Sequence, residues 1–238
     1  MATITPDKRQ RHVLTEHTSR IKKGRKIEAL LSEYTPLKGK SLLDVGAGAG
    51  WIAHYFQEQG CKVTATDQTE ELSVDVPFVQ SKGRVLPFET ASFDIVIYNH
   101  VIEHVGDRSE QMEHLQEIKR VLKRDGLLYL SVPNKWALIE NHYNLPFLSW
   151  LPNKLASAYV NFFGKNDWYD CTPFGRQEMA TFMGAAGFDT TELTKKALAY
   201  FIKHEIGTGP KALFAKILFG FDFMMPIIPT LIYLGHPK

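Results

Sequence analysis

The stretch SLLDVGAGAGW at residues 41–51 decides the fold of this chain. A short apolar run at residues 41–45 has an acid, Asp44, near its end. Glycines then follow at every second position, and an amphipathic segment begins at Trp51. This order predicts a strand, a tight turn and the first turn of a helix, because glycine adopts positive φ and lets a ligand approach the backbone. The free N–H groups at the start of the helix favour an anionic or electron-rich group. The loop is therefore predicted to hold a cofactor.

The spacing of the glycines narrows the choice of cofactor. A dinucleotide-binding turn has the pattern G-x-G-x-x-G, whereas this one has G-x-G-x-G with Asp44 two residues before the first glycine. That carboxylate would repel a pyrophosphate, so it argues for a cationic ligand. A second apolar run at residues 61–67 ends in Asp67, at the position from which a carboxylate can accept both ribose hydroxyls.

Two acids and a glycine turn at these spacings resemble the cofactor site of class I S-adenosylmethionine (SAM)-dependent methyltransferases. Residues 86–99, with a Leu-Pro-Phe turn, Ser-Phe-Asp and an apolar strand, resemble the ubiquinone- and menaquinone-biosynthesis type. Residues 100–106, HVIEHVG, are similar to that family's signature after its fourth strand. The resemblance implies an α/β fold with a Rossmann-like, seven-stranded, mostly parallel sheet. Its strand order would be 3-2-1-4-5-7-6, with the last strand antiparallel and helices on both faces.

The same resemblance implies which residues bind SAM and its product, S-adenosylhomocysteine. Asp44 would lie near the methionine ammonium, Asp67 would accept the ribose hydroxyls and Gln68 would flank the adenine. Where the family commonly has an acid that binds the adenine amino group, this chain has Lys82, so a backbone contact near Gly83 or Arg84 is expected instead. The expected cofactor-binding residues are Asp44, Gly46, Ala47, Gly48, Gly50, Asp67, Gln68, Gly83, Arg84, Asn99 and His100.

The 238 residues are expected to form a single methyltransferase domain. Its expected parts are an N-terminal helical segment (1–38), a SAM-binding core (39–135), a substrate lid (136–172) and the end of the core (173–238). The last part should hold apolar helices over residues 211–224 and a final antiparallel strand at 230–234. The lid follows the fifth strand, beyond the carboxyl edge of the sheet, where open α/β folds bind ligands.

Local patterns predict several element boundaries. An amphipathic helix is expected over residues 17–34, and the crossover after Asp67 is too short for more than one or two helical turns. Pro77 indicates an edge strand at residues 76–80. A capping box of Asp107 and Glu110 should start a helix that Gly126 ends, followed by a strand at 127–132. A helix over 173–186 and a strand over 188–195 should complete the core.

Methyl transfer from a sulfonium is an in-line displacement, so a hydroxyl acceptor must be positioned and must lose a proton. The candidate bases are His100, His104 and His142, each with an ordinary pKa near ~6.5. His104 has a second reading, in which it only orders the turn before a helix. The candidate substrate contacts all lie in the lid: Trp136, His142, Tyr143, Trp168 and Tyr169.

These features favour methyl transfer to a small-molecule or lipid-linked acceptor. O-methylation of a sugar or phenolic hydroxyl is the favoured reaction. C-methylation of a quinone-type ring and a non-enzymatic SAM-binding regulatory or scaffold protein remain open. Glu103 and His104 are too few ligands to predict a metal site, because adjacent side chains usually diverge. An RNA methyltransferase is disfavoured because no Asn-Pro-Pro-Tyr-type motif follows the fourth strand.

Charge and composition limit the partners. Residues 8–40 hold ten Lys or Arg, but the net charge is only +2, so a solvated helix face is expected and no nucleic acid. The two cysteines, far apart in the chain, and the lack of an apolar signal run favour a cytoplasmic protein. The charge-free run at residues 223–237 is shorter than the ~20 residues of a spanning helix and contains three prolines. The apolar C-terminal helices leave open a peripheral membrane contact or a homodimer.

Overall fold

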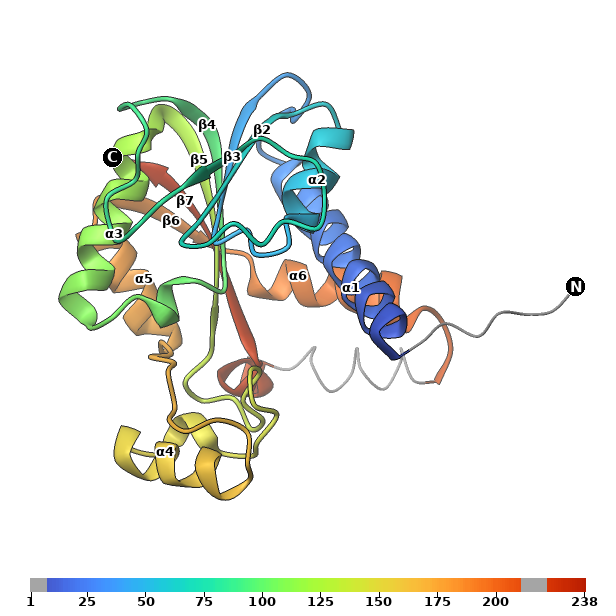
Figure 1. Ribbon diagram of the computed structural model, residues 1–238, viewed down its shortest axis with the longest axis vertical. Helices are drawn as coiled ribbons and strands as arrows, with labels where there is room; N and C mark the ends of the chain where they lie inside the picture. The colour runs from blue at the N-terminus through green and yellow to red at the C-terminus, as the bar shows by residue number, and fades with distance from the viewer. Residues whose placement is uncertain (1–7, 211–221) are drawn as a thin grey trace, which may run out of the picture.

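A computed structural model describes residues 8–210 and 222–238 as a central sheet with helices on both faces (Figure 1). The strand order is β3-β2-β1-β4-β5-β7-β6, with β7 antiparallel to both of its neighbours. This is the predicted fold class, which is therefore confirmed. The strands are β1 (Ser41–Val45), β2 (Lys62–Asp67), β3 (Phe78–Gln80), β4 (Phe93–Asn99), β5 (Leu122–Pro133), β6 (Phe188–Glu192) and β7 (Thr230–Pro237).

The central strand β1 is buried on both faces because its neighbouring apolar side chains face opposite ways. Leu42 belongs to the core beneath helices α1 (Lys8–Leu31), α2 (Trp51–Glu58) and α6 (Thr194–Phe201). Leu43 belongs to the core beneath α3 (Arg108–Val121) and α5 (Arg176–Ala185). Figure 1 shows these two helical layers on either side of the sheet. A strand of this kind needs a continuous apolar run, which is what the sequence has.

The aspartate of the Ser-Phe-Asp segment anchors the start of β1 to the start of β4. Asp94 accepts hydrogen bonds from the Ser41 N–H (2.9 Å) and hydroxyl (2.7 Å) and pairs with the Lys123 ammonium (3.0 Å). Partial burial opposes ionisation, but the bonds from Ser41 and Lys123 outweigh it and hold the Asp94 pKa below its ordinary value of 3.8. The motif therefore sets the register between the two strands that flank the candidate site.

Replacing Asp94 with asparagine is expected to lower the free energy of unfolding at pH 7 by about 1.5–3 kcal/mol, the usual contribution of hydrogen bonds to a charged group. Because the folded pKa is depressed, this stability is present above about pH 3.8 and is lost as pH falls through the lower folded value. Urea unfolding between pH 2 and 8 measures it. Asp189→Asn is the control, since its pair with Lys238 is largely exposed; equal losses in both variants would contradict the assignment.

Two predicted boundaries around β5 are wrong. Helix α3 begins with the predicted capping box, in which the Asp107 side chain accepts from the Glu110 N–H, but it ends at Val121. Lys123 and Gly126 lie in β5, which starts at Leu122 opposite Phe93. The pairing of Lys123 with Asp94 and an irregular register between Phe93 and Ile95 favour extended backbone there. These long-range contacts override the local helix-ending signals.

Other segments differ from their predictions in length. The described residues 68–77 contain no helix, so the crossover is shorter than the one or two turns expected, and β3 is an edge strand of only Phe78–Gln80. Helix α1 starts at Lys8 and α5 at Arg176. The predicted strand 188–195 ends at Glu192, because the Thr194 hydroxyl accepts the Ile232 N–H at 3.1 Å and starts α6. The predicted apolar helices over 211–224 lie mostly outside the described residues, which resume at η4 (Asp222–Ile227).

Residues 136–172 fold back on themselves beyond the end of β5 and form the protruding lower part of the molecule in Figure 1. They contain η2 (Leu148–Trp150) and α4 (Asn153–Phe162), although the sequence shows no single period. A small core of their own joins Leu148, Val160, Tyr169 and Cys171. Within the described parts of the chain, none of the helices is both long and apolar enough to cross a membrane.

Candidate active site

The glycine loop between β1 and α2 has three glycines with positive φ, at 71° for Gly46, 53° for Gly48 and 80° for Gly50. A side chain at Gly46 would overlap Val101, and a Cβ at Gly50 would lie 2.7 Å from Leu72. Nothing lies within 4 Å of the corresponding position at Gly48. The first and third glycines therefore serve the packing of the loop, and the middle one leaves open space beside the backbone.

This contrast gives a test of the loop. Gly46→Ala is expected to lower the free energy of unfolding by about 2–4 kcal/mol, since left-handed strain and the overlap with Val101 add together. Gly48→Ala has only the backbone strain and should lose about 1–2 kcal/mol. Denaturant titration of the ligand-free variants compares them. Equal destabilisation would show that Val101 yields freely to a methyl group.

Asp44 lies beneath the loop, with its side chain buried. Burial raises its pKa from 3.8 to about 7, while the nearby Arg20 charge acts in the opposite direction. Arg20 comes from α1 and lines the same small cavity as Asp44, Gly46, Trp51 and Asn99. Nothing in the periodicity of α1 distinguishes Arg20 from the other basic residues of the helix, so the sequence did not predict its place in this cavity.

Asp67 joins the end of β2 to the glycine loop. One of its carboxylate oxygens accepts the Gly48 N–H at 2.8 Å and the other accepts the Gln68 N–H at 2.7 Å. Beside it opens a cleft of about 660 Å³. The expected cofactor residues that line this cleft are Gly46, Asp67, Gln68, Gly83, Arg84 and His100, and those that line the neighbouring cavity are Asp44, Gly46, Ala47, Gly50 and Asn99. The Arg84 guanidinium pairs with Glu110 and with Glu113 on α3.

The three candidate bases lie in one cluster, although they come from three places in the chain. His100 follows β4, His104 ends η1 (Ile102–His104) and His142 belongs to the segment 136–172. The ring centroids are 5.9 Å apart for His100 and His142 and 5.0 Å apart for His104 and His142. His100 and His104 also line the large cleft. The fold therefore brings the candidate bases to the edge of the expected cofactor site.

Glu103 holds two of these histidines. Its Oε1 lies 3.2 Å from His100 Nδ1 and 3.3 Å from His142 Nε2, and its side chain is 0% exposed. Burial opposes the ionisation of Glu103, but the hydrogen bonds from His100 and His142 hold its pKa well below the ordinary value. Sequence reasoning considered Glu103 only as a metal ligand. Its position after a strand, three residues beyond His100, was the available signal.

The two histidines bound to Glu103 have different proton affinities. Burial lowers the pKa of His100 despite the hydrogen bond to Glu103. Burial also acts to lower the pKa of His142, but Glu103 and nearby acids outweigh it and raise that pKa. His100 has a left-handed backbone with φ 57°, and its N–H donates to the Ser131 carbonyl at 3.0 Å. Non-glycine residues with such backbone strain cluster at functional sites. His100 is thus neutral at pH 7 and can accept a proton.

The expected substrate residues of the lid lie in different environments. Tyr143 donates its hydroxyl to Asp170 at 2.6 Å, and Asp170 lies 3.7 Å from His104 Nδ1. Tyr169 is buried in the small core of the segment 136–172. Trp136 packs edge-on against Trp150, with ring centroids 6.1 Å apart, and Trp168 is largely exposed. Among these five residues, His142 and Tyr143 lie in the network that reaches the histidine cluster.

Comparisons with known proteins agree with this architecture. Residues 43–130 match the family described as "Methyltransferase domain". A ubiquinone biosynthesis O-methyltransferase of Caulobacter vibrioides is 30% identical over 112 residues, 42% of this chain and 43% of that protein. A malonyl-(acyl-carrier protein) O-methyltransferase of Enterobacter lignolyticus is 27% identical over 111 residues, 44% of this chain and 43% of that protein. The chain thus matches less than half the length of both relatives.

Among solved structures, a 1,6-didemethyltoxoflavin-N1-methyltransferase of Burkholderia thailandensis, with bound S-adenosylhomocysteine, has a TM-score of 0.54 at 20% identity. The match covers 96% of this chain and 82% of that one, and it shows a shared fold. Residues 43–130 thus match a methyltransferase domain, and the sheet has the strand order that the resemblance to class I, SAM-dependent methyltransferases implied. Its relatives include the ubiquinone-biosynthesis type, so the resemblance that the motifs indicated is confirmed.

Proposed function

We propose that this protein transfers the methyl group of SAM to a hydroxyl of a small-molecule or lipid-linked acceptor. The observation that carries the proposal is His100, which lines the cofactor cleft and is oriented by the buried Glu103. The acceptor oxygen attacks the sulfonium methyl carbon, the carbon–sulfur bond breaks, and S-adenosylhomocysteine leaves. The hydroxyl proton passes to the neutral imidazole of His100.

The cofactor in this proposal is held at both of its ends. The Asp44 carboxylate binds the methionine ammonium, and Arg20, which lines the same cavity, binds the methionine carboxylate. Asp67 has lone pairs beyond those that accept the Gly48 and Gln68 N–H groups, and these accept the ribose hydroxyls. Gly83 and Arg84 line the cleft on the side proposed for the adenine. Their backbone groups would bind the adenine amino group in place of the carboxylate that this family commonly has.

The surface of the lid favours a lipid-linked acceptor and a peripheral membrane contact. It exposes large apolar side chains, with Phe162 82% exposed. The exposed members of this set are Trp136, Leu138, Ile139, Phe147, Trp150, Leu155, Phe162, Phe163 and Trp168. Aromatic residues with nearby lysines, here Lys154 in the first turn of α4 and Lys165 three residues after its end, are typical of surfaces that lie in a lipid headgroup region.

We expect the wild-type protein to sediment with vesicles of mixed neutral and anionic phospholipid. The double variant Phe162→Ser, Phe163→Ser should sediment at least about tenfold less, because each aromatic side chain buried in the bilayer contributes about 1.5–3 kcal/mol to binding. Val85→Ser, which removes an exposed apolar side chain outside the lid, is the control. Wild-type protein that stays in the supernatant would favour a free small-molecule acceptor.

Calorimetry with SAM and S-adenosylhomocysteine tests the cofactor part of the proposal, and transfer of a labelled methyl group from SAM into small-molecule and lipid extracts tests the reaction. The proposal expects tight binding of both compounds and a labelled product whose methyl carbon has the NMR shift of an O-methyl group. A C-methyl shift would instead support methylation of a quinone-type ring. Binding without transfer to any fraction would favour the scaffold alternative, and absence of binding would refute all three.

A further inference from the structure

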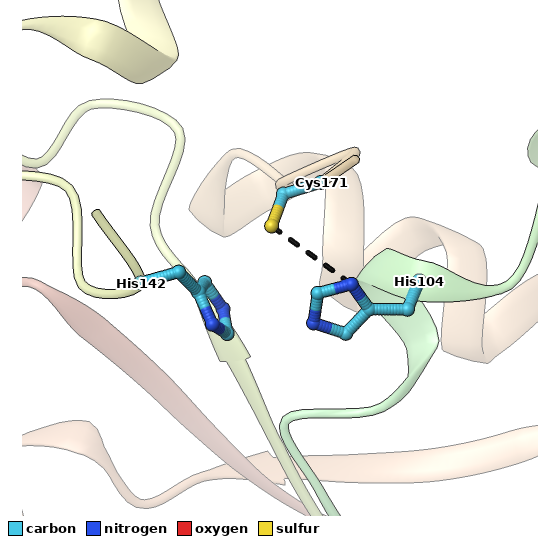
Figure 2. Close-up of side chains that lie close together, drawn as sticks. All are labelled: His104, His142 and Cys171. Atoms are coloured by element: carbon cyan, nitrogen blue, oxygen red, sulfur yellow. Dashed lines mark hydrogen bonds between the residues drawn. The ribbon is translucent and has the colours of Figure 1, made fainter. Parts of the chain in front are cut away.

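Three side chains with metal-binding atoms converge beside the cleft that His104 lines. His104 comes from the core, while His142 and Cys171 come from the two ends of the segment 136–172 (Figure 2). Each offers one ligand atom, and these atoms all lie within 4.8 Å of one another. Figure 2 shows the Cys171 sulfur directed at the His104 ring, with the His142 ring opposite. Separate parts of the fold therefore form one potential ligand set.

The existing contacts within this set are long. Cys171 Sγ lies 3.9 Å from His104 Nδ1, and the nearest Asp170 oxygen lies 3.7 Å from the same nitrogen. The Glu103 carboxylate, by comparison, approaches its histidines at 3.2 and 3.3 Å. Cys171 is only 2% exposed, whereas both imidazoles are partly open to solvent. The sulfur is therefore shielded, and an ion can enter from the histidine side.

Two imidazoles and a thiolate are the ligand chemistry of Zn²⁺. A zinc ion with Zn–N of about 2.0–2.1 Å and Zn–S of about 2.3 Å has ligand atoms roughly 3.3–3.7 Å apart in tetrahedral geometry. The present separations of up to 4.8 Å need a contraction on the order of 1 Å. Three protein ligands leave the fourth position to water, as in zinc sites that are open to exchange.

The surroundings supply the outer contacts that such a site needs. His142 Nε2 lies 3.3 Å from Glu103 Oε1, so its other ring nitrogen is the one left for an ion. Glu103 Oε2 is buried and has no hydrogen-bond partner among the described residues. Glu103, a Cys171 thiolate and Asp170, whose Oδ1 lies 3.5 Å from Cys171 Sγ, supply the negative charge that faces a dication.

A second set of possible ligands, His100, Glu103 and His142, shares one histidine with the first. In that set Glu103 Oε1 already lies at hydrogen-bond distance from both imidazoles. An ion there would have to replace these bonds, whereas at His104, His142 and Cys171 it replaces the weak S–H bond from Cys171 to Asp170 (3.5 Å) and the 3.9 Å contact between Cys171 and His104. The first set is therefore the favoured one.

We propose that His104, His142 and Cys171 bind a zinc ion that fastens both ends of the segment 136–172 to the core. As the Sγ–Zn bond forms, the Cys171 thiol gives its proton to solvent, and no oxidant or reductant is needed. The ion would fix the segment that carries His142 relative to the glycine loop. Binding of zinc does not depend on the proposed methyl transfer, so either proposal can fail alone.

The test uses the full chain after chelation and dialysis. Addition of Zn²⁺ is expected to give one ion per chain by elemental analysis, and Co²⁺, as a spectroscopic probe, is expected to give tetrahedral d–d bands and a thiolate-to-cobalt charge-transfer band. Cys171→Ser should lose the charge-transfer band and weaken zinc binding by more than about 100-fold, since even outer-contact changes cost 10–100-fold. Glu103→Gln should weaken binding by about 10–100-fold and keep the band.

Cys61→Ser is the matched control, because Cys61 is also buried and donates its S–H to the Leu37 carbonyl away from this cluster. Circular dichroism and SAM binding show whether each variant is folded. Zinc binding by Cys171→Ser equal to wild type, or an octahedral cobalt spectrum without the thiolate band, would overturn the proposal. Loss of binding in His100→Gln with retention in His104→Gln would place the ion at the second set and would also overturn it.

Discussion

Replacing His100 with glutamine is expected to lower kcat by about 10²–10⁴-fold, the usual contribution of a positioned general base. His100 lines the cofactor cleft, its backbone is held in a left-handed conformation, and Glu103 orients its ring through Nδ1. Burial lowers its pKa, so the imidazole is neutral and able to accept the acceptor proton at pH 7. Glutamine keeps a polar side chain of similar reach but has no basic nitrogen.

Steady-state and single-turnover kinetics measure this loss, with SAM binding followed separately. His236→Gln is the matched control, since His236 lies on β7 opposite Asp189 of the edge strand β6. Retained SAM affinity with the reduced kcat would assign His100 to the chemical step. A kcat within about threefold of wild type, well below the effect of a general base, would remove His100 from the role and leave His104 and His142 to be tested in the same way.

The second large effect is expected at Asp44. Asp44→Asn should weaken SAM binding by about 10–100-fold, because a hydrogen-bonded charge contributes about 1.5–3 kcal/mol and the substitution removes the charge that we propose binds the methionine ammonium. The same variant should make the ligand-free protein more stable above pH 7. Burial raises the Asp44 pKa to about 7, so ionising this carboxyl in the fold costs stability that grows as pH rises from 3.8 towards 7.

The raised pKa of Asp44 also predicts how SAM binding depends on pH. If the ammonium of SAM binds the ionised Asp44 carboxylate, as proposed, SAM affinity should rise with pH up to about 7, by at most about tenfold per pH unit, and then level off. Calorimetry at pH 6 in buffers of different ionisation enthalpy should detect proton release on binding, which is absent in Asp44→Asn. Glu58→Gln on the exposed end of α2 is the control. Wild-type affinity in Asp44→Asn would exclude the proposed contact.

The sequence alone determined the sheet and its cofactor loop, because these depend on rules that act over a few residues. Alternating and continuous apolar runs define strands, and the glycines at residues 46, 48 and 50 all have the positive φ that their residue type permits. The parallel strand order then places Asp44 and Asp67 at the same edge. Boundaries such as the start of β5 were predicted less well. They depend on a long-range contact, because Lys123 pairs with Asp94 on the neighbouring strand β4.

Only the tertiary structure decided which side chains meet around that loop. The N-terminal helix brings Arg20 into the cavity of Asp44, and the segment 136–172 returns His142 to Glu103 and Cys171 to His104. Sequence periodicity does not predict these contacts. They depend on the path of the segment 136–172, which is stabilised by its own small core, and on the direction of each side chain. The sequence therefore specified the cofactor site through backbone geometry, while the catalytic and metal-binding candidates arise from long-range packing of partly polar segments.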